Sequence, residues 1–143
     1  MSSYINFFVE RNGVYIPVAE YSRSNPIYSA LSDIAPYEKM IELDEKSYNE
    51  GIANFNRAIE NFKYMISIDE KEIEDARSIE APIQEKLQAI YEIRSDIRGA
   101  EEELDLVESQ KAQFQFLYYM RDEWSKVKVY FGIEVGDPGY PEE

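Results

Sequence analysis

The fold is decided by the stretch from Asp44 to Lys126, which reads DEKSYNEGIANFNRAIENFKYMISIDEKEIEDARSIEAPIQEKLQAIYEIRSDIRGAEEELDLVESQKAQFQFLYYMRDEWSK. It contains two segments whose apolar residues recur at alternating steps of four and three, the pattern of a helix packed lengthwise against another. Between them lies SIEAP, at residues 78–82. Pro82 lacks an N–H and disfavours helix at Ala81, yet proline suits the first turn of a new helix. We therefore predict two long antiparallel helices joined near Glu80.

The first helix is expected to begin after Asp44, because an aspartate side chain accepts hydrogen bonds from the free N–H groups of a first turn. Leu43 and Tyr48 stand where a hydrophobic staple requires them. Its seam, the row of residues that faces the other helix, comprises Tyr48, Ile52, Phe55, Ile59, Phe62, Ile66 and Ile73, with Asp69 and Ala76 in two further slots.

The second helix is expected to carry a similar seam. Its members are Ile83, Leu87, Ile90, Ile93, Ile97, Ala100, Leu104, Val107, Phe114 and Tyr118, with Lys111 as an interruption. A turn centred near Glu80 sets a register in which Phe62 faces Gly99 and Ala100. With a rise of 1.5 Å per residue, about 35 residues make a helical arm roughly 50 Å long.

A small sheet is predicted from the segments outside this arm. Asn12-Gly13 lies between two alternating runs and favours a two-residue type I′ hairpin turn, which needs positive φ at both positions. This loop pairs Val9 with Ile16, Phe7 with Val18, and Ile5 with Glu20. Pro17 cannot donate a ladder hydrogen bond, so the second strand is expected at an edge.

Three further segments complete the predicted base. Residues 127–135 alternate as a half-buried strand, which we place beside the first strand and opposite the Pro17 edge. Asn25-Pro26 opens a short helix. Residues 39–43 fit either a short strand or an early helical turn, and the fresh helix start at Asp44 favours the strand.

These elements predict an α+β fold in one domain, residues 1–143. A small antiparallel sheet base (residues 1–43 and 127–136) carries a long antiparallel two-helix coiled-coil arm (44–126), and 137–143 form a loose tail.

Composition limits the function classes. The 143 residues contain 15 Lys and Arg against 29 Asp and Glu, a formal charge of −14. Such a chain repels nucleic acid and anionic membranes. There is no His and no Cys, so the commonest general base and thiolate chemistry are both missing. No long apolar run or signal peptide is visible, which favours a cytoplasmic location.

No chemical motif stands out, and we predict no catalytic, cofactor-binding or metal-binding residue and no enzyme activity. Residues 69–80 begin with Asp like a calcium loop, but Glu74 stands where that loop needs Gly. Carboxylates that share a helix face, such as Glu70 with Glu74, leave a magnesium site open, although a di-metal bundle site would want His. Tyr118, Tyr119 and Trp124 fit either a ligand-stacking surface or, at helical spacing, the core.

Two functions remain. The first is a non-enzymatic protein-interaction module that binds a partner protein through the acidic arm. The candidate partner-binding residues are Glu70, Glu74, Glu85, Glu92, Asp96 and Glu103. The alternative is an acidic mimic of nucleic acid, since Glu85, Glu92, Asp96 and Glu103 form one stripe that can occupy a basic channel. Such a mimic would inhibit a DNA- or RNA-binding enzyme of the restriction or CRISPR type, and small acidic chains without Cys or His are common among phage accessory proteins.

Self-association is also expected. Met65, Ile68, Leu106 and Leu117 are apolar residues outside the predicted seams. A two-helix arm would leave them in water, whereas pairing two arms into a four-helix bundle would cover them. A twofold homodimer is the commonest symmetric solution.

Overall fold

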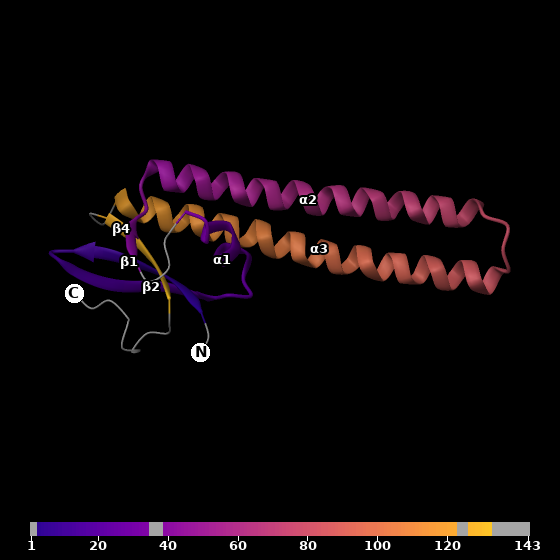
Figure 1. Ribbon diagram of the computed structural model, residues 1–143, viewed down its shortest axis with the longest axis horizontal. Helices are drawn as coiled ribbons and strands as arrows, with labels where there is room; N and C mark the ends of the chain where they lie inside the picture. Colours follow the sequence, from indigo (N-terminus) through magenta and orange to yellow (C-terminus); the bar gives the residue numbers. More distant parts are fainter. Residues whose placement is uncertain (1–2, 35–38, 123–125, 133–143) are drawn as a thin grey trace. The chain divides into compact units, whose positions relative to one another are not determined.

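The computed structural model describes residues 3–34, 39–122 and 126–132. In chain order the elements are β1 (Tyr4–Arg11), β2 (Val14–Ser22), α1 (Pro26–Leu31), β3 (Met40–Glu42), α2 (Glu45–Ser78), α3 (Ile83–Tyr119), a 3-10 turn (Met120–Asp122) and β4 (Lys126–Gly132). The predicted α+β fold, with an antiparallel sheet and a long helical hairpin, is confirmed (Figure 1).

Contacts divide the chain into two compact units. The base unit comprises residues 1–55 and 109–143, and the hairpin unit comprises residues 56–108. The first turns of α2 and the last turns of α3 fall in the same unit as the sheet. The predicted division into a base and an arm at residues 44 and 126 stays a prediction. The single-domain organisation stays a prediction.

The sheet of the base unit has the strand order β2-β1-β4-β3, and all its pairs are antiparallel. Pro17 lies in β2, at an edge as predicted. β4 pairs with β1 on the side away from β2, and residues 39–43 contain the strand β3 rather than a helical turn. Residues 133–135 of the predicted last strand lie outside the described residues.

The hairpin turn of β1 and β2 is as predicted, but its register changes further along. Asn12 and Gly13 have φ values of 55° and 80°, and Val9 pairs with Ile16. Beyond an irregularity between Phe7 and Phe8, Phe7 pairs with Ala19 and Ile5 with Tyr21. The predicted pairs Phe7–Val18 and Ile5–Glu20 are therefore wrong by one residue. The extra residue follows Pro17, where a strand that lacks a donor N–H can accommodate a β-bulge.

The central strand β1 is buried on both faces. Ile5, Phe7 and Val9 point to one face of β1, Asn6 and Phe8 to the other, and none is more than 1% exposed. Tyr130 of β4 is also buried. The alternation predicted for this strand is confirmed at Val127 and Val129, which are buried, and at Lys128, which is half-buried. Tyr130 departs from it, because it is buried although it lies on the second face.

Aromatic rings join the sheet to the helix ends within the base unit. The ring of Phe114 lies 6.5 Å from that of Phe7 and 5.7 Å from that of Phe55. Tyr48 stacks on Tyr118 at 3.8 Å between centroids. Tyr118 therefore serves the core, the second of its two predicted roles, whereas Tyr119 is exposed and Trp124 lies outside the described residues.

The start of α2 is capped reciprocally. The backbone N–H of Ser47 donates to Oδ1 of Asp44, and the backbone N–H of Asp44 donates to Oγ of Ser47, both at 2.9 Å. This is a capping box in which Ser takes the usual place of Glu or Gln. The hydrogen bond from the Ser47 N–H stabilises the carboxylate and lowers the pKa of Asp44. Leu43 and Tyr48 are both buried, as the predicted staple requires.

Within the hairpin unit, the α2 and α3 segments lie side by side and antiparallel (Figure 1). Every predicted α2 seam residue is buried or half-buried, including Asp69 and Ala76. The α3 seam is confirmed from Ile90 onward, but its start is wrong, because Ile83 and Leu87 are 73% and 61% exposed. Lys86 instead occupies the first seam position of α3 and is half-buried. Its Nζ donates a hydrogen bond to the Arg77 carbonyl at 3.3 Å.

The predicted contact of Phe62 with Gly99 is also wrong. Gly99 is exposed, and a Cβ built there meets no atom within 4 Å. Ala100, the next residue, is half-buried and holds the seam position.

Candidate functional site

The seams define two flanks of the hairpin unit. Residues that directly precede a seam residue lie on one side of each helix, and residues that directly follow one lie on the other. The base unit shows which sides coincide in the antiparallel pair. Asn54 of α2 and Gln110 of α3 both precede seam residues, and both hydrogen-bond to α1, at the Ala30 carbonyl and the Ile27 N–H. The preceding residues of both helices therefore share one flank in the base unit, and the geometry of antiparallel heptads places them on one flank within the hairpin unit as well.

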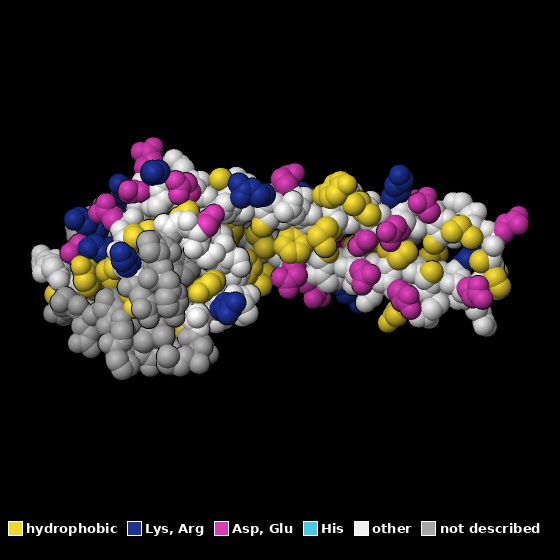
Figure 2. Space-filling model, in the orientation of Figure 1, with side chains coloured by type: hydrophobic (Ala, Val, Ile, Leu, Met, Phe, Trp, Pro, Cys, Tyr) yellow, Lys and Arg dark blue, Asp and Glu magenta, His cyan; other side chains and the backbone are white. Residues whose placement is uncertain are grey.

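The flank of preceding residues, here called the acidic flank, has one sign of charge. Its α2 residues are Ala58, Asn61, Met65, Ile68, Glu72 and Asp75, and its α3 residues are Glu85, Ala89, Glu92, Asp96, Gly99, Glu103 and Leu106. It contains carboxylates on both helices and no Lys or Arg. Figure 2 shows a face of the hairpin helices on which acidic and hydrophobic side chains intermingle and few basic ones occur.

Apolar side chains on the acidic flank face solvent. Met65 is 51% exposed, Ile68 is 40% exposed and Leu106 is 39% exposed. Met65 and Ile68 lie one turn apart on α2, so they form a continuous apolar strip. Leu117, which we expected to be exposed with them, is instead buried in the base unit.

The opposite side, here called the mixed flank, carries both signs of charge. Its acids are Glu60, Glu70, Glu74, Glu101, Asp105 and Glu108, and its bases are Lys63, Arg77, Arg94 and Arg98. Leu87 and Tyr91 are its exposed apolar residues.

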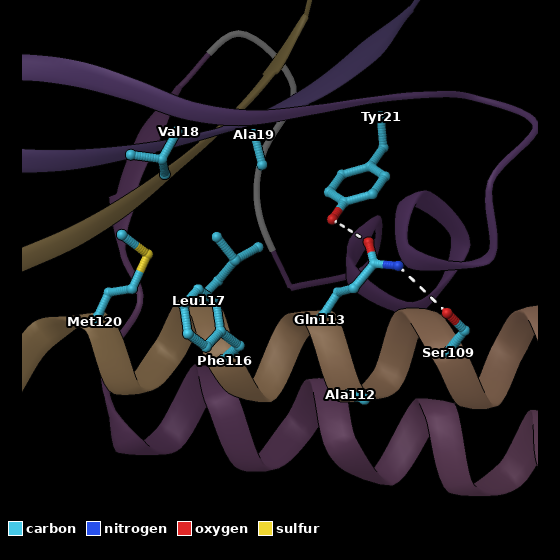
Figure 3. A pocket seen from close by; sticks show the side chains of 9 residues that line it. All are labelled: Val18, Ala19, Tyr21, Ser109, Ala112, Gln113, Phe116, Leu117 and Met120. Atoms are coloured by element: carbon cyan, nitrogen blue, oxygen red, sulfur yellow. Dashed lines mark hydrogen bonds between the residues drawn. The ribbon is translucent and has the colours of Figure 1, made fainter.

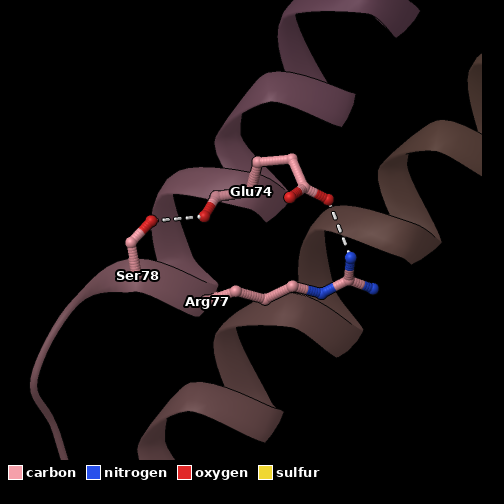
Figure 4. Close-up of polar contacts among 3 residues, drawn as sticks. All are labelled: Glu74, Arg77 and Ser78. Carbon is pink, nitrogen blue, oxygen red and sulfur yellow. Dashed lines mark hydrogen bonds and ion pairs between the residues drawn. The ribbon is translucent and has the colours of Figure 1, made fainter.

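The predicted site residues therefore fall on two surfaces. Glu85, Glu92, Asp96 and Glu103 lie together on the acidic flank and are all exposed, whereas Glu70 and Glu74 lie on the mixed flank. Glu74 forms an ion pair of 2.7 Å with Arg77, and its carbonyl accepts a hydrogen bond from Ser78 (Figure 4). In the sequence analysis the six residues formed one set because they were chosen by charge. Whether each residue precedes or follows a seam residue was not considered.

Further polar contacts join neighbouring turns of the hairpin helices. Glu92 accepts a hydrogen bond from Gln88 at 3.1 Å. Ion pairs between described residues include Glu74–Arg77 in the hairpin unit, and Glu42–Lys126 and Glu10–Lys128 in the base unit.

Two alternatives can now be assessed. Residues 69–78 lie within α2, so they do not form a calcium loop. Across residues 3–34, 39–122 and 126–132, no group of three or more Asp, Glu, His or Cys side chains is placed to hold a metal ion. A search of the same residues finds no helix with the length and apolarity needed to span a membrane.

The base unit contains a groove that the sequence did not indicate. It has a volume of about 540 Å³ and lies between β2 and α3, lined by side chains such as Val18, Tyr21, Phe116 and Leu117 (Figure 3). The Tyr21 hydroxyl donates to Oε1 of Gln113 at 2.6 Å, and burial raises the pKa of Tyr21. Phe116 is 69% exposed. The lining is mainly apolar and contains no carboxylate, so the groove is suited to binding rather than to acid–base chemistry.

Comparison of this chain with known protein families, with curated proteins and with solved structures finds no match.

Proposed function

We propose that the protein is a non-enzymatic interaction module that binds a partner protein through its helical hairpin. The observation that carries this proposal is the acidic flank, where Met65, Ile68 and Leu106 face solvent among carboxylates. Exposed apolar groups rimmed by polar ones are a feature of protein-binding surfaces. Covering apolar surface stabilises a complex by about 25 cal/mol per Å².

Replacement of the hairpin tip tests this proposal. Substituting a short Gly-rich turn for residues 70–90 removes the acids at 72, 75 and 85 and shortens both flanks. In a pull-down from cells that produce the protein, this variant should lose the partner. The matched control is Phe116→Ser, which alters an exposed side chain of the base groove and should retain it. Recovery of the same proteins with and without residues 70–90 would exclude the tip as part of the binding surface. Recovery of the same proteins by M65S/I68S as well would exclude the hairpin as the binding element.

A second candidate is mimicry of nucleic acid, favoured by the row of Glu85, Glu92, Asp96 and Glu103 on a flank without Lys or Arg. A mimic would occupy the basic channel of a DNA- or RNA-binding enzyme. Its affinity for that enzyme should fall steeply as salt rises. Binding that is equal at low and high salt, or unchanged after Glu→Gln substitution along the row, would exclude it.

We also propose that the chain forms a homodimer. From the sequence we expected the dimer to cover Met65, Ile68, Leu106 and Leu117, but we propose the contact on the mixed flank instead. Two acidic flanks would bring carboxylates against carboxylates, which opposes pairing. The mixed flank offers Leu87 and Tyr91 for burial, together with Arg94 and Arg98 for pairing with acids of a second copy. The cytoplasmic location expected from the sequence stays a prediction.

A further inference from the structure

We infer that the acidic flank of the hairpin unit is a docking surface for one class of partner, a cationic amphipathic helix. The inference rests on the proposed function and specifies the chemistry of the partner. Three features of the flank support it: its shape, its charge and what covers the equivalent positions elsewhere in the chain.

The shape suits a helix. Met65 and Ile68 on α2 and Leu106 on α3 supply exposed apolar side chains on both helices. Gly99 has open space where its Cβ would be, so the α3 backbone is accessible there. A third helix laid along two antiparallel helices would place one apolar stripe over these residues.

The charge selects the sign of that helix. Glu72 and Asp75 on α2, and Glu92, Asp96 and Glu103 on α3, accompany the apolar residues, and no Lys or Arg lies among them. A partner helix with Lys or Arg beside its apolar stripe would meet a carboxylate on either side, and the long aliphatic stems of these residues would cover further apolar surface.

The same charge disfavours other occupants. A second copy would present another acidic flank, and like charges face to face are destabilising. Nucleic acid is polyanionic and is repelled for the same reason.

The equivalent positions in the base unit are covered by a helix of the chain itself. Gly51 precedes the seam residue Ile52, and a Cβ there would lie 2.7 Å from Cδ2 of Leu31 in α1. Gln110 precedes Lys111, and its side chain receives the Ile27 N–H of α1 at 2.9 Å. In the base unit, helix α1 therefore packs against residues that precede the seam. In the hairpin unit, the corresponding residues Met65, Ile68 and Leu106 remain exposed.

The experiment titrates full-length protein with three synthetic helical peptides of about three heptads each, using calorimetry. The first peptide has Leu at the two apolar heptad positions and Lys beside them. The second replaces Lys by Glu, and the third keeps Lys but replaces Leu by Ser. The variant is the triple substitution E92Q/D96N/E103Q on the acidic flank. Its matched control is E101Q/D105N/E108Q, which makes the same charge change at exposed positions of the same helix, on the mixed flank.

We expect the Lys–Leu peptide to bind the wild-type protein and the other two peptides to bind at least about tenfold more weakly. The acidic-flank triple should weaken binding of the Lys–Leu peptide about tenfold, because losing three exposed charge pairs lowers the affinity by roughly a factor of ten. The control triple should weaken binding less than about twofold. M65S/I68S should also weaken binding, with L87S/Y91S as the control. All ten residues substituted in these four variants are exposed, and circular dichroism of each variant verifies that the helices persist.

Equal effects of the two triples would overturn the inference, because attraction would then reflect net charge alone. Equal binding of the Lys–Leu and Lys–Ser peptides would overturn it as well. The tip replacement described above separates the two proposals. If the tip replacement abolishes partner capture but the two triple variants weaken binding of the Lys–Leu peptide equally, the hairpin still binds a partner. That partner is then not a cationic helix on the acidic flank.

Discussion

The side-chain amide of Gln110 on α3 donates a hydrogen bond of 2.7 Å to Oδ1 of Asn25, the N-cap residue of α1. The carbonyl oxygen of the same amide accepts the backbone N–H of Ile27 at 2.9 Å. Asn25 makes no side-chain cap to its own helix, so Gln110 satisfies a first-turn N–H in its place. A buried glutamine on the long helix thereby anchors the short one.

Substitution of Gln110 tests this anchor. Gln110→Leu keeps the residue's size but leaves the Ile27 N–H and the side-chain Oδ1 of Asn25 without the Gln110 side chain as their partner. We expect a loss of about 2 kcal/mol in unfolding free energy, because unsatisfied buried polar groups are costly. Urea unfolding measures the loss. The neighbouring Ser109→Ala, at an exposed position, is the control and should change stability by less than about 0.5 kcal/mol. A Leu variant as stable as the control would show that the anchor contributes nothing.

Two helical glycines should respond in opposite directions to the same substitution. At Gly51 a Cβ would lie 2.7 Å from Leu31 and 2.8 Å from Phe114, so Gly51→Ala overpacks the base core and should destabilise it by about 1–3 kcal/mol. At Gly99 the space is open, and Gly99→Ala should stabilise the protein by up to about 1 kcal/mol through helix propensity. Thermal and urea unfolding of both variants provide the comparison. Stabilisation by both substitutions would contradict the close packing at Gly51.

The cap at Asp44 predicts a pH dependence. Its pKa is lowered in the folded state, so the stabilisation from the ionised carboxylate is present above its unfolded pKa, near pH 4, and is lost as the pH falls through the lower folded value. Asp44→Asn keeps a capping oxygen without the charge. The difference in unfolding free energy between the wild type and this variant should therefore be largest at neutral pH and shrink below about pH 4. A difference that is constant from acid to neutral pH would mean that the charge at residue 44 has no role in capping.

Self-association through the mixed flank can be distinguished from association through the acidic flank. Sedimentation equilibrium should give twice the mass of one 16.8 kDa chain. L87S/Y91S should weaken the dimer, whereas M65S/I68S should leave it unchanged. A single-chain mass at high protein concentration and moderate salt would contradict the dimer, and the reverse pattern of variants would place it on the acidic flank.

The long helices could be predicted because their signal is repeated many times. The alternating steps of four and three, the cap residue Asp44 and the helix-breaking Pro82 all indicate the same two helices. An error at one position therefore does not change the predicted pattern. The prediction of where the α3 seam starts was wrong because Ile83 and Leu87 are more hydrophobic than Lys86. Lys86 nevertheless fits the heptad step, and its amine reaches the Arg77 carbonyl at the end of α2.

Contacts between residues far apart in the chain could not be predicted from the sequence. The role of Gln110 depends on residues more than eighty positions away, and a polar residue beside the predicted seam looks like any solvated one. The bulge after Pro17 shifts a register that a two-residue turn fixes only locally. The acidic flank required only the seam phase, however, since the residues that precede each seam slot can be read directly from the heptads.

Photo-cross-linking tests the central claim, binding through the acidic flank, most directly. A photoreactive amino acid is placed at Met65 on the acidic flank, at Tyr91 on the mixed flank or at Phe116 on the base, all of them exposed positions. After irradiation of cells that produce the protein, the account predicts a cross-linked partner protein from position 65 and none of that identity from positions 91 or 116. The same partner captured from position 116 but not from position 65 would contradict it.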